Sequence, residues 1–153
     1  MKKYPALFVA LLFFIAVTAQ QQKLVLDHEK IFTTKEIASI DSILQQYRRS
    51  SGRIVLISTD TLDISTERYA TNLVNQFVKD STNKPYILML LLSKKKVMIL
   101  ASINDKVKPF IKDRTLFDIL DAGIPAFKER RSAEGSTLIC KKAMKFLNTL
   151  PGK

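Results

Sequence analysis

The stretch KPYILMLLLSKKKVMILAS, residues 84–102, decides the fold of this chain. It holds two apolar runs, residues 86–92 and 97–102, which are separated by one serine and three lysines. The first run shows no alternation of apolar and polar residues, so we expect burial of both its faces, as in a central strand covered on two sides. The basic tetrapeptide can reverse the chain and make the second run an antiparallel hairpin partner.

Amphipathic helices are expected on the N-terminal side of this hairpin. A capping box of Thr33 and Glu36 predicts the start of a helix over about residues 34–49, and Gly52 is suited to its end. A β-branched run at residues 53–58 predicts the first core strand. A second helix, over about residues 66–80, joins this strand to the hairpin, so the two strands should be parallel. Residues 24–27, ahead of the first helix, read as a short extended entry.

Beyond the hairpin the sequence predicts helices. Asp113 is expected to cap one of them, and Gly123 and Pro125 must break it, because proline lacks a backbone donor and crowds the preceding turn. Residues 132–135 read as a turn before a last helix over about residues 136–147. Strands that alternate with helices predict an α/β protein, a three-layer α/β/α sandwich with a mixed, mostly parallel central sheet.

The N-terminus has the pattern of a secretory signal peptide. Lys2 and Lys3 precede an apolar run at residues 6–17, and Ala19 ends a cleavage site of small residues. The run has about 12 residues, against the roughly 20 that a spanning helix needs, and an uncleaved membrane anchor is the alternative reading. We expect a protein exported to the periplasm or secreted, with no membrane span after cleavage. The predicted organisation is a signal peptide at 1–19, a leader and short entry segment at 20–32, and a single domain at 33–149.

The chain is strongly basic, with a formal net charge of +11. Cleavage of the signal peptide would lower this charge to about +9. A cationic surface attracts an anionic protein, lipid or polysaccharide, whereas export and the lack of interleaved aromatic residues argue against a nucleic acid. The alternative is that the cations are ordinary solvated faces, with the hairpin lysines preventing aggregation. The candidate partner-binding residues are Lys94, Lys95, Lys96, Arg130 and Arg131.

Few side chains are suited to catalysis. Asp27, Asp105 and Asp113 fall at expected strand or loop ends, where sheets of this kind bind ligands, and are candidate carboxylate ligands for Ca²⁺ or Mg²⁺. His28, the only histidine, reads as an exposed loop residue, and Cys140, the only cysteine, as a buried, inert thiol. No catalytic residue is identified, because the chain has neither a Gly-rich phosphate cradle nor a nucleophile elbow.

The order of these motifs resembles the TPM domain family, which includes thylakoid lumen proteins linked to photosystem II repair and many exported bacterial proteins. The resemblance covers about residues 24–147 and includes the hairpin. It is also carried by Asp27 before the capped helix, by Tyr69-Ala70 near the start of the second helix, and by Pro125-Ala126-Phe127. It implies the three-layer fold. It also implies weak acid phosphatase activity or divalent metal binding, as in some members, or a role as an assembly or accessory factor, as in others.

The chain departs from that family where a metal would be expected. The loop before the central strand usually carries an Asp and a Gly, and here it is Asn83-Lys84-Pro85. The family's Gly-rich segment after the hairpin is here Ser102-Ile103-Asn104-Asp105. We therefore expect an exported, non-catalytic interaction or accessory module that binds an anionic partner. A weak metal-assisted acid phosphatase that acts on phosphomonoesters is the alternative.

Overall fold

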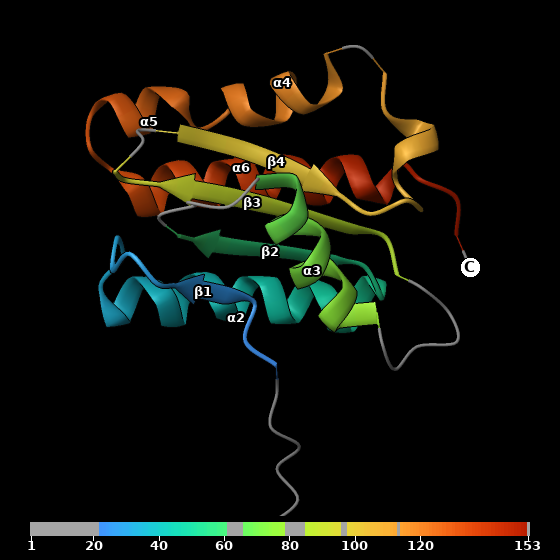
Figure 1. Ribbon diagram of the computed structural model, residues 1–153, viewed down its shortest axis with the longest axis horizontal. Helices are drawn as coiled ribbons and strands as arrows, with labels where there is room; N and C mark the ends of the chain where they lie inside the picture. Colours follow the sequence, from blue (N-terminus) through green and yellow to red (C-terminus); the bar gives the residue numbers. More distant parts are fainter. Residues whose placement is uncertain (1–21, 61–65, 79–84, 96–97, 113, 153) are drawn as a thin grey trace, which may run out of the picture.

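One mixed sheet forms the centre of the molecule (Figure 1). The computed structural model describes residues 22–60, 66–78, 85–95, 98–112 and 114–152. Within these ranges the strands are β1 (Val25–Asp27), β2 (Ile54–Thr59), β3 (Ile87–Ser93) and β4 (Met98–Ile103), in that spatial order. The first three are parallel, and β4 pairs with β3 in the antiparallel sense. The predicted α/β class with a mixed, mostly parallel sheet is confirmed.

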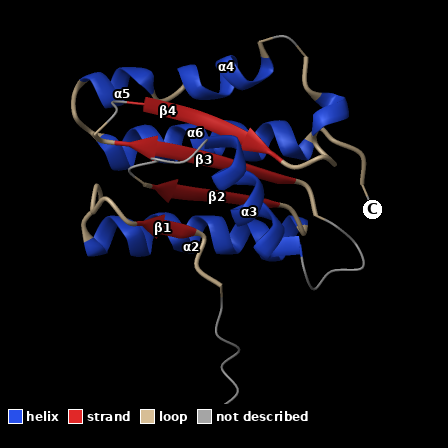
Figure 2. Ribbon diagram, in the orientation of Figure 1, coloured by secondary structure: helices blue, strands red, loops and turns tan. Residues whose placement is uncertain are grey.

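Helices cover both faces of the sheet (Figure 2). The described helices are α2 (Thr34–Ser51), α3 (Thr66–Val78), α4 (Thr115–Asp121), α5 (Ile124–Lys128) and α6 (Ser132–Asn148), with a 3-10 turn, η1 (Lys108–Phe110), after β4. Helices α2 and α6 pack together on one face, and α3 lies on the other, against β3 and β4. Helices α4 and α5 pack against α6, and α4 also contacts β4. In the ranges given above, no helix is long and apolar enough to span a bilayer.

The apolar run at residues 86–92 forms most of the central strand β3. Every residue of β3 is buried, as is every residue of β2 beside it, while β4 is half-buried. Burying one large aliphatic side chain stabilises a fold by about 1.5–3 kcal/mol, so these two strands supply much of the core. The predicted burial on both faces, the parallel β2–β3 pairing and the hairpin are all confirmed.

Helix α2 begins and ends as its sequence predicts. The Thr33 hydroxyl accepts a hydrogen bond from the Glu36 N–H at 3.3 Å, and the Glu36 carboxylate accepts one from the Thr33 N–H at 2.7 Å. At the other end, Gly52 adopts a left-handed conformation with φ 65°, and its N–H donates to the Arg48 carbonyl. The helix extends two residues beyond the predicted end.

The short entry segment is a true strand, because Val25 pairs with Ile57 and Asp27 with Thr59. Three residues are too few to show the period-2 alternation by which a strand is recognised in a sequence. The predicted cap at Asp113 lies outside the described residues, and the N-cap position of α4 is occupied by Arg114. The predicted signal peptide also lies outside them.

The predicted turn at residues 132–135 is wrong, because α6 already begins at Ser132. Gly135 was read as a turn residue, but it lies inside the helix at a close approach to the α4–α5 corner. A Cβ on Gly123 would lie 2.4 Å from the Gly135 carbonyl oxygen, and one on Gly135 would lie 2.7 Å from the Phe127 ring. Both positions require glycine for packing, and this contact fixes Phe127 and the residues after it on α6.

Candidate functional site

Asp27 closes the loop that follows β1. Its carboxylate accepts hydrogen bonds from the backbone N–H groups of Ile31 and Phe32, both at 2.9 Å, and from the Thr59 hydroxyl at 2.6 Å. Oδ1 therefore joins the loop to Thr59 at the end of β2, while Oδ2 binds the loop alone. Sequence reasoning missed this role, although short acidic side chains commonly accept hydrogen bonds from backbone N–H groups a few residues further on.

A second carboxylate, Glu29, joins the same loop to the β3–β4 turn. The Glu29 N–H donates to the Thr59 hydroxyl oxygen at 3.1 Å. The Glu29 carboxylate accepts hydrogen bonds from the Ser93 hydroxyl at 3.3 Å and from the Lys94 backbone N–H. The β1–α2 loop, the end of β2 and the β3–β4 turn are thus fixed together at the carboxyl edge of the parallel strands. Ligands of open α/β sheets usually bind at this edge.

The connection from α5 to α6 forms the opposite side of the site. The Arg131 N–H donates to the Ala126 carbonyl at 2.8 Å, and the Arg130 N–H donates to the Phe127 carbonyl at 2.9 Å. These two bonds define a Schellman motif at the end of α5. Arg130 occupies its left-handed position with φ 60°, where glycine is usual. The tight turn places Arg130 two residues before the start of α6.

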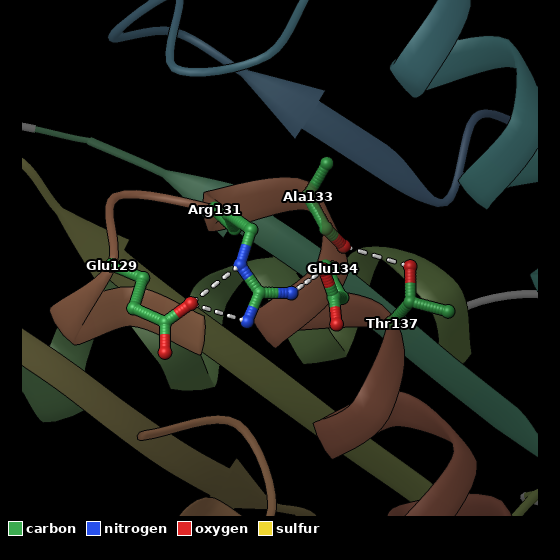
Figure 3. A network of polar contacts seen from close by, with 5 residues as sticks. All are labelled: Glu129, Arg131, Ala133, Glu134 and Thr137. Atoms are coloured by element: carbon green, nitrogen blue, oxygen red, sulfur yellow. Dashed lines mark hydrogen bonds and ion pairs between the residues drawn. The ribbon is translucent and has the colours of Figure 1, made fainter. Parts of the chain in front are cut away.

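Arg131 is already paired within its own segment (Figure 3). Its Nε and Nη2 atoms donate to the Glu129 carboxylate at 3.0 and 2.7 Å, and its Nη1 atom donates to the Glu134 carboxylate. The Thr137 hydroxyl in the same view donates to the Ala133 carbonyl at 2.8 Å, one turn back along α6. The positive charge of Arg131 is therefore balanced locally, unlike that of its neighbour Arg130.

A cavity of about 700 Å³ lies between these segments. Its lining is mainly apolar and combines the β1–α2 loop, the hairpin and the α5–α6 connection: Ile31, Leu92, Ser93, Lys94, Met98, Ile99, Phe127, Arg130 and Ser132. A smaller cavity of about 370 Å³ shares Ile31, Arg130 and Ser132 with it. Its other lining residues are Glu36 from α2, Arg131 just before α6, and Ala133 and Glu134 from α6. Because three lining residues are shared, the two cavities form one groove, which we call the carboxyl-edge groove.

Two of the predicted partner-binding residues meet at this groove. Lys94, from the hairpin turn, and Arg130, from the α5–α6 connection, are both exposed and both line the larger cavity. Arg131 lines only the smaller cavity. Lys95 is exposed on the turn beside Lys94, and Lys96 lies outside the described residues. Among the residues that the structure describes, neither the Lys94 ammonium nor the Arg130 guanidinium has a hydrogen-bonding or ion-pairing partner.

The two predicted metal ligands that the structure describes, Asp27 and Asp105, are not brought together. Asp27 ends β1 at the carboxyl edge, whereas Asp105 follows β4 at the opposite end of the sheet, where it is exposed and pairs with Lys108 at 2.6 Å. Asp113 lies outside the described residues. Within the described part of the chain, no three His, Cys, Asp or Glu side chains are grouped to hold a metal ion. Binding of Ca²⁺ or Mg²⁺ by any of the three aspartates stays a prediction.

Other reactive groups are not among the residues that line the two cavities. Cys140 is buried, as predicted, and burial raises the pKa of its thiol to about 12, so it is not a nucleophile at neutral pH. His28 is exposed, also as predicted. The sequence did not reveal a pair on the α3 side of the sheet, where the Ser58 and Tyr69 hydroxyls lie 2.8 Å apart. Burial, followed by the charge of Asp60, raises the pKa of Tyr69 and keeps its hydroxyl protonated.

Comparison with known proteins gives a family match and several similar structures. A family model described as the TPM domain matches residues 25–146. The N-terminal domain of a protein from P. gingivalis shares 19% sequence identity with a TM-score of 0.64, covering 86% of this chain and 85% of that chain. The BA42 protein from the psychrophilic bacterium Bizionia argentinensis shares 15% identity with a TM-score of 0.68, covering 82% and 88%.

A third similar structure, the N-terminal domain of the cg2496 protein from Corynebacterium glutamicum, shares 12% identity with a TM-score of 0.61, covering 87% and 85%. At such low identities, these three structures show a common fold alone. No curated protein matches the chain.

Proposed function

This chain belongs to the TPM domain family, and from that premise we propose that it is an exported, non-catalytic interaction or accessory module that binds an anionic partner. The observation that carries the proposal is the meeting of Lys94 and Arg130 at one cavity, from segments distant in the sequence. Neither side chain has an ion-pairing partner among the described residues. Two such cations at the ligand-binding edge of a sheet favour an anion between them.

The surrounding hydrogen bonds support a binding surface that is formed in advance. Asp27 and Glu29 hold the β1–α2 loop against β2 and the hairpin turn. The Schellman motif holds Arg130 on the other side. A preorganised site loses less conformational entropy on binding than a mobile one. The overall positive charge of the chain would also accelerate the approach of an acidic partner.

The proposal is tested by binding of fluorescently labelled polyglutamate, measured as anisotropy over a series of salt concentrations. Affinity should fall as salt rises, because salt screens attraction between exposed charges, with a Debye length of about 10 Å at 0.1 M. The double variant Lys94→Gln/Arg130→Gln should bind at least about tenfold more weakly, a loss of about 1.4 kcal/mol.

The matched control is Lys141→Gln/Lys142→Gln, which removes the same charge from exposed positions on α6. Its affinity for polyglutamate should fall by less than about threefold, since it changes only the long-range electrostatic field. Equal losses in both double variants would mean that net charge alone attracts polyglutamate. Absent or salt-independent binding would refute the proposal. Turnover of a phosphomonoester that is lost with Asp113→Ala would replace it with the phosphatase alternative.

A further inference from the structure

The larger cavity has more apolar lining residues than a site that binds only an anion requires. Five of its side chains are apolar, and they come from the loop, both strands of the hairpin and α5: Ile31, Leu92, Met98, Ile99 and Phe127. Ligand pockets in proteins are typically about 300–1,000 Å³, mostly apolar, with a few polar groups that fix orientation. A cavity of about 700 Å³ with this lining is suited to a ligand that has an apolar part as well as a charge.

The polar groups are placed to orient such a ligand. Lys94 and Arg130 are the cations without a described partner, and Ser132 adds a hydroxyl to the same lining. An arginine can hold a carboxylate through two parallel hydrogen bonds, which fixes direction as well as charge. Met98 brings a flexible thioether, which adapts to apolar groups of different shapes.

The backbone at Arg130 supports a role for its side chain. A residue with φ 60° at the end of a Schellman motif is normally glycine, because a Cβ is unfavourable in the left-handed region. The chain nevertheless has arginine at this position, and this arginine lines both cavities. Glycine would relieve the backbone, so the arginine is explained better by its guanidinium than by the turn.

We propose that the carboxyl-edge groove binds a peptide segment of a partner protein in which an apolar side chain lies close to a carboxylate. The apolar side chain enters the cavity beside Met98 and Phe127, and the carboxylate lies between Lys94 and Arg130. This inference rests on the proposed function and narrows it, from any anionic partner to an acidic peptide with an apolar anchor.

The smaller cavity distinguishes a peptide from a uniformly negative surface. It is lined by the carboxylates of Glu36 and Glu134 as well as by Arg131, which is already paired. Because Glu36 already accepts hydrogen bonds from Thr33 and Glu134 is paired with Arg131, the smaller cavity adds no attraction for a purely negative membrane or polymer beyond that of Lys94 and Arg130. A peptide continues from the anchored residues with backbone N–H and C=O groups, and an N–H donor is a favourable partner for a carboxylate.

The experiment uses labelled peptides with a Gly/Ser background that carry one Asp and one Leu at separations of one to four positions. Matched peptides replace the Asp with Asn or the Leu with Ser, and polyglutamate and vesicles with anionic headgroups are added as separate probes. At least one peptide with both residues should bind the protein about tenfold more tightly than either matched peptide. Binding only to vesicles would overturn the peptide assignment.

Two variants separate the contribution of the apolar anchor from that of the carboxylate. Met98→Gln keeps the side-chain length but adds polarity. It should therefore abolish the affinity that the Leu side chain adds to a peptide, while polyglutamate still binds. Arg130→Gly should weaken peptide binding at least about tenfold and leave the melting temperature unchanged or higher, because glycine suits the left-handed position. A merely structural arginine would instead give a lower melting temperature and unchanged binding, which would overturn the inference.

The two proposals fail in different ways. If polyglutamate binds with the expected salt dependence but Leu adds nothing at any separation, the apolar-anchor inference is wrong and the proposed function stands. If neither polyglutamate nor any peptide binds, both are wrong. If the Met98→Gln variant still binds the Leu peptide more tightly than the peptide without Leu, the apolar side chain binds elsewhere. That result would also overturn the inference.

Discussion

Replacement of Asp27 by alanine tests whether this carboxylate serves structure or metal binding. The side chain accepts three hydrogen bonds, two from backbone N–H groups of the β1–α2 loop and one from the Thr59 hydroxyl. A hydrogen bond to a charged group contributes about 1.5–3 kcal/mol, and its loss leaves the donors unsatisfied. The side chain is half-buried, so water can replace part of this network. We expect a loss of about 3 kcal/mol in the free energy of unfolding.

For a domain of this size, that loss corresponds to a fall in melting temperature of about 10 °C. Urea titration and thermal unfolding, both followed by circular dichroism, measure the two quantities. Asp27→Asn, which keeps one acceptor oxygen, should lose about half as much. The control is Asp121→Ala at the exposed end of α4, which should change stability by less than about 0.5 kcal/mol.

Repeating the thermal unfolding with Ca²⁺ or Mg²⁺ separates the two roles. An ion that binds the folded state raises the melting temperature. If Asp27 is structural, its alanine variant is destabilised by the same amount with and without the ion. The reasoning is refuted if the variant loses less than about 1 kcal/mol, or if the ion stabilises the wild type and Asp27→Ala abolishes that effect.

Three further predictions concern packing, reactivity and pH. Gly123→Ala should lower the free energy of unfolding by about 3 kcal/mol, because its Cβ would lie 2.4 Å from the Gly135 carbonyl oxygen; a urea midpoint equal to that of the wild type would contradict this packing. Cys140, whose pKa burial raises to about 12, should react with a thiol reagent only after unfolding, and fast reaction of the native protein at pH 8 would be inconsistent with its burial. The backbone hydrogen bond from Thr33 lowers the pKa of Glu36, so Glu36→Ala should be less stable than the wild type at neutral pH, by less than about 1 kcal/mol. That difference should shrink as the pH falls below about 4.5, where the carboxylate becomes protonated; a difference independent of pH would exclude this contribution.

The parts of the fold that could be predicted are those encoded by long local patterns. The apolar run of β3, the capping box at Thr33 and the stop at Gly52 each specify their structure within a few residues. Strand β1 was read only as an extended entry, since three residues carry too little periodicity and its pairing with β2 depends on distant contacts. The start of α6 was misplaced because Gly135 resembles a turn residue, and its true reason is the close approach of Gly123.

The site was predictable as a list of residues but not as an arrangement. The sequence identifies Lys94 and Arg130 as exposed cations, and the structure brings them to one cavity through the packing of the α5–α6 connection beside the hairpin. The position of Asp27 at the end of a strand predicts a metal ligand. Its hydrogen bonds to the loop depend on how that loop folds back, which residue type alone does not specify.

The most direct test of the central claim is an NMR titration of the isotope-labelled protein with polyglutamate, which reads backbone amides and the arginine side-chain Nε–H groups. We predict that the largest shift changes occur at Ser93, Lys94, Arg130 and Ser132, and that they saturate together with one affinity. Shift changes spread evenly over exposed lysines such as Lys141 and Lys142, with the Arg130 Nε–H unaffected, would contradict an anion-binding site at the carboxyl-edge groove.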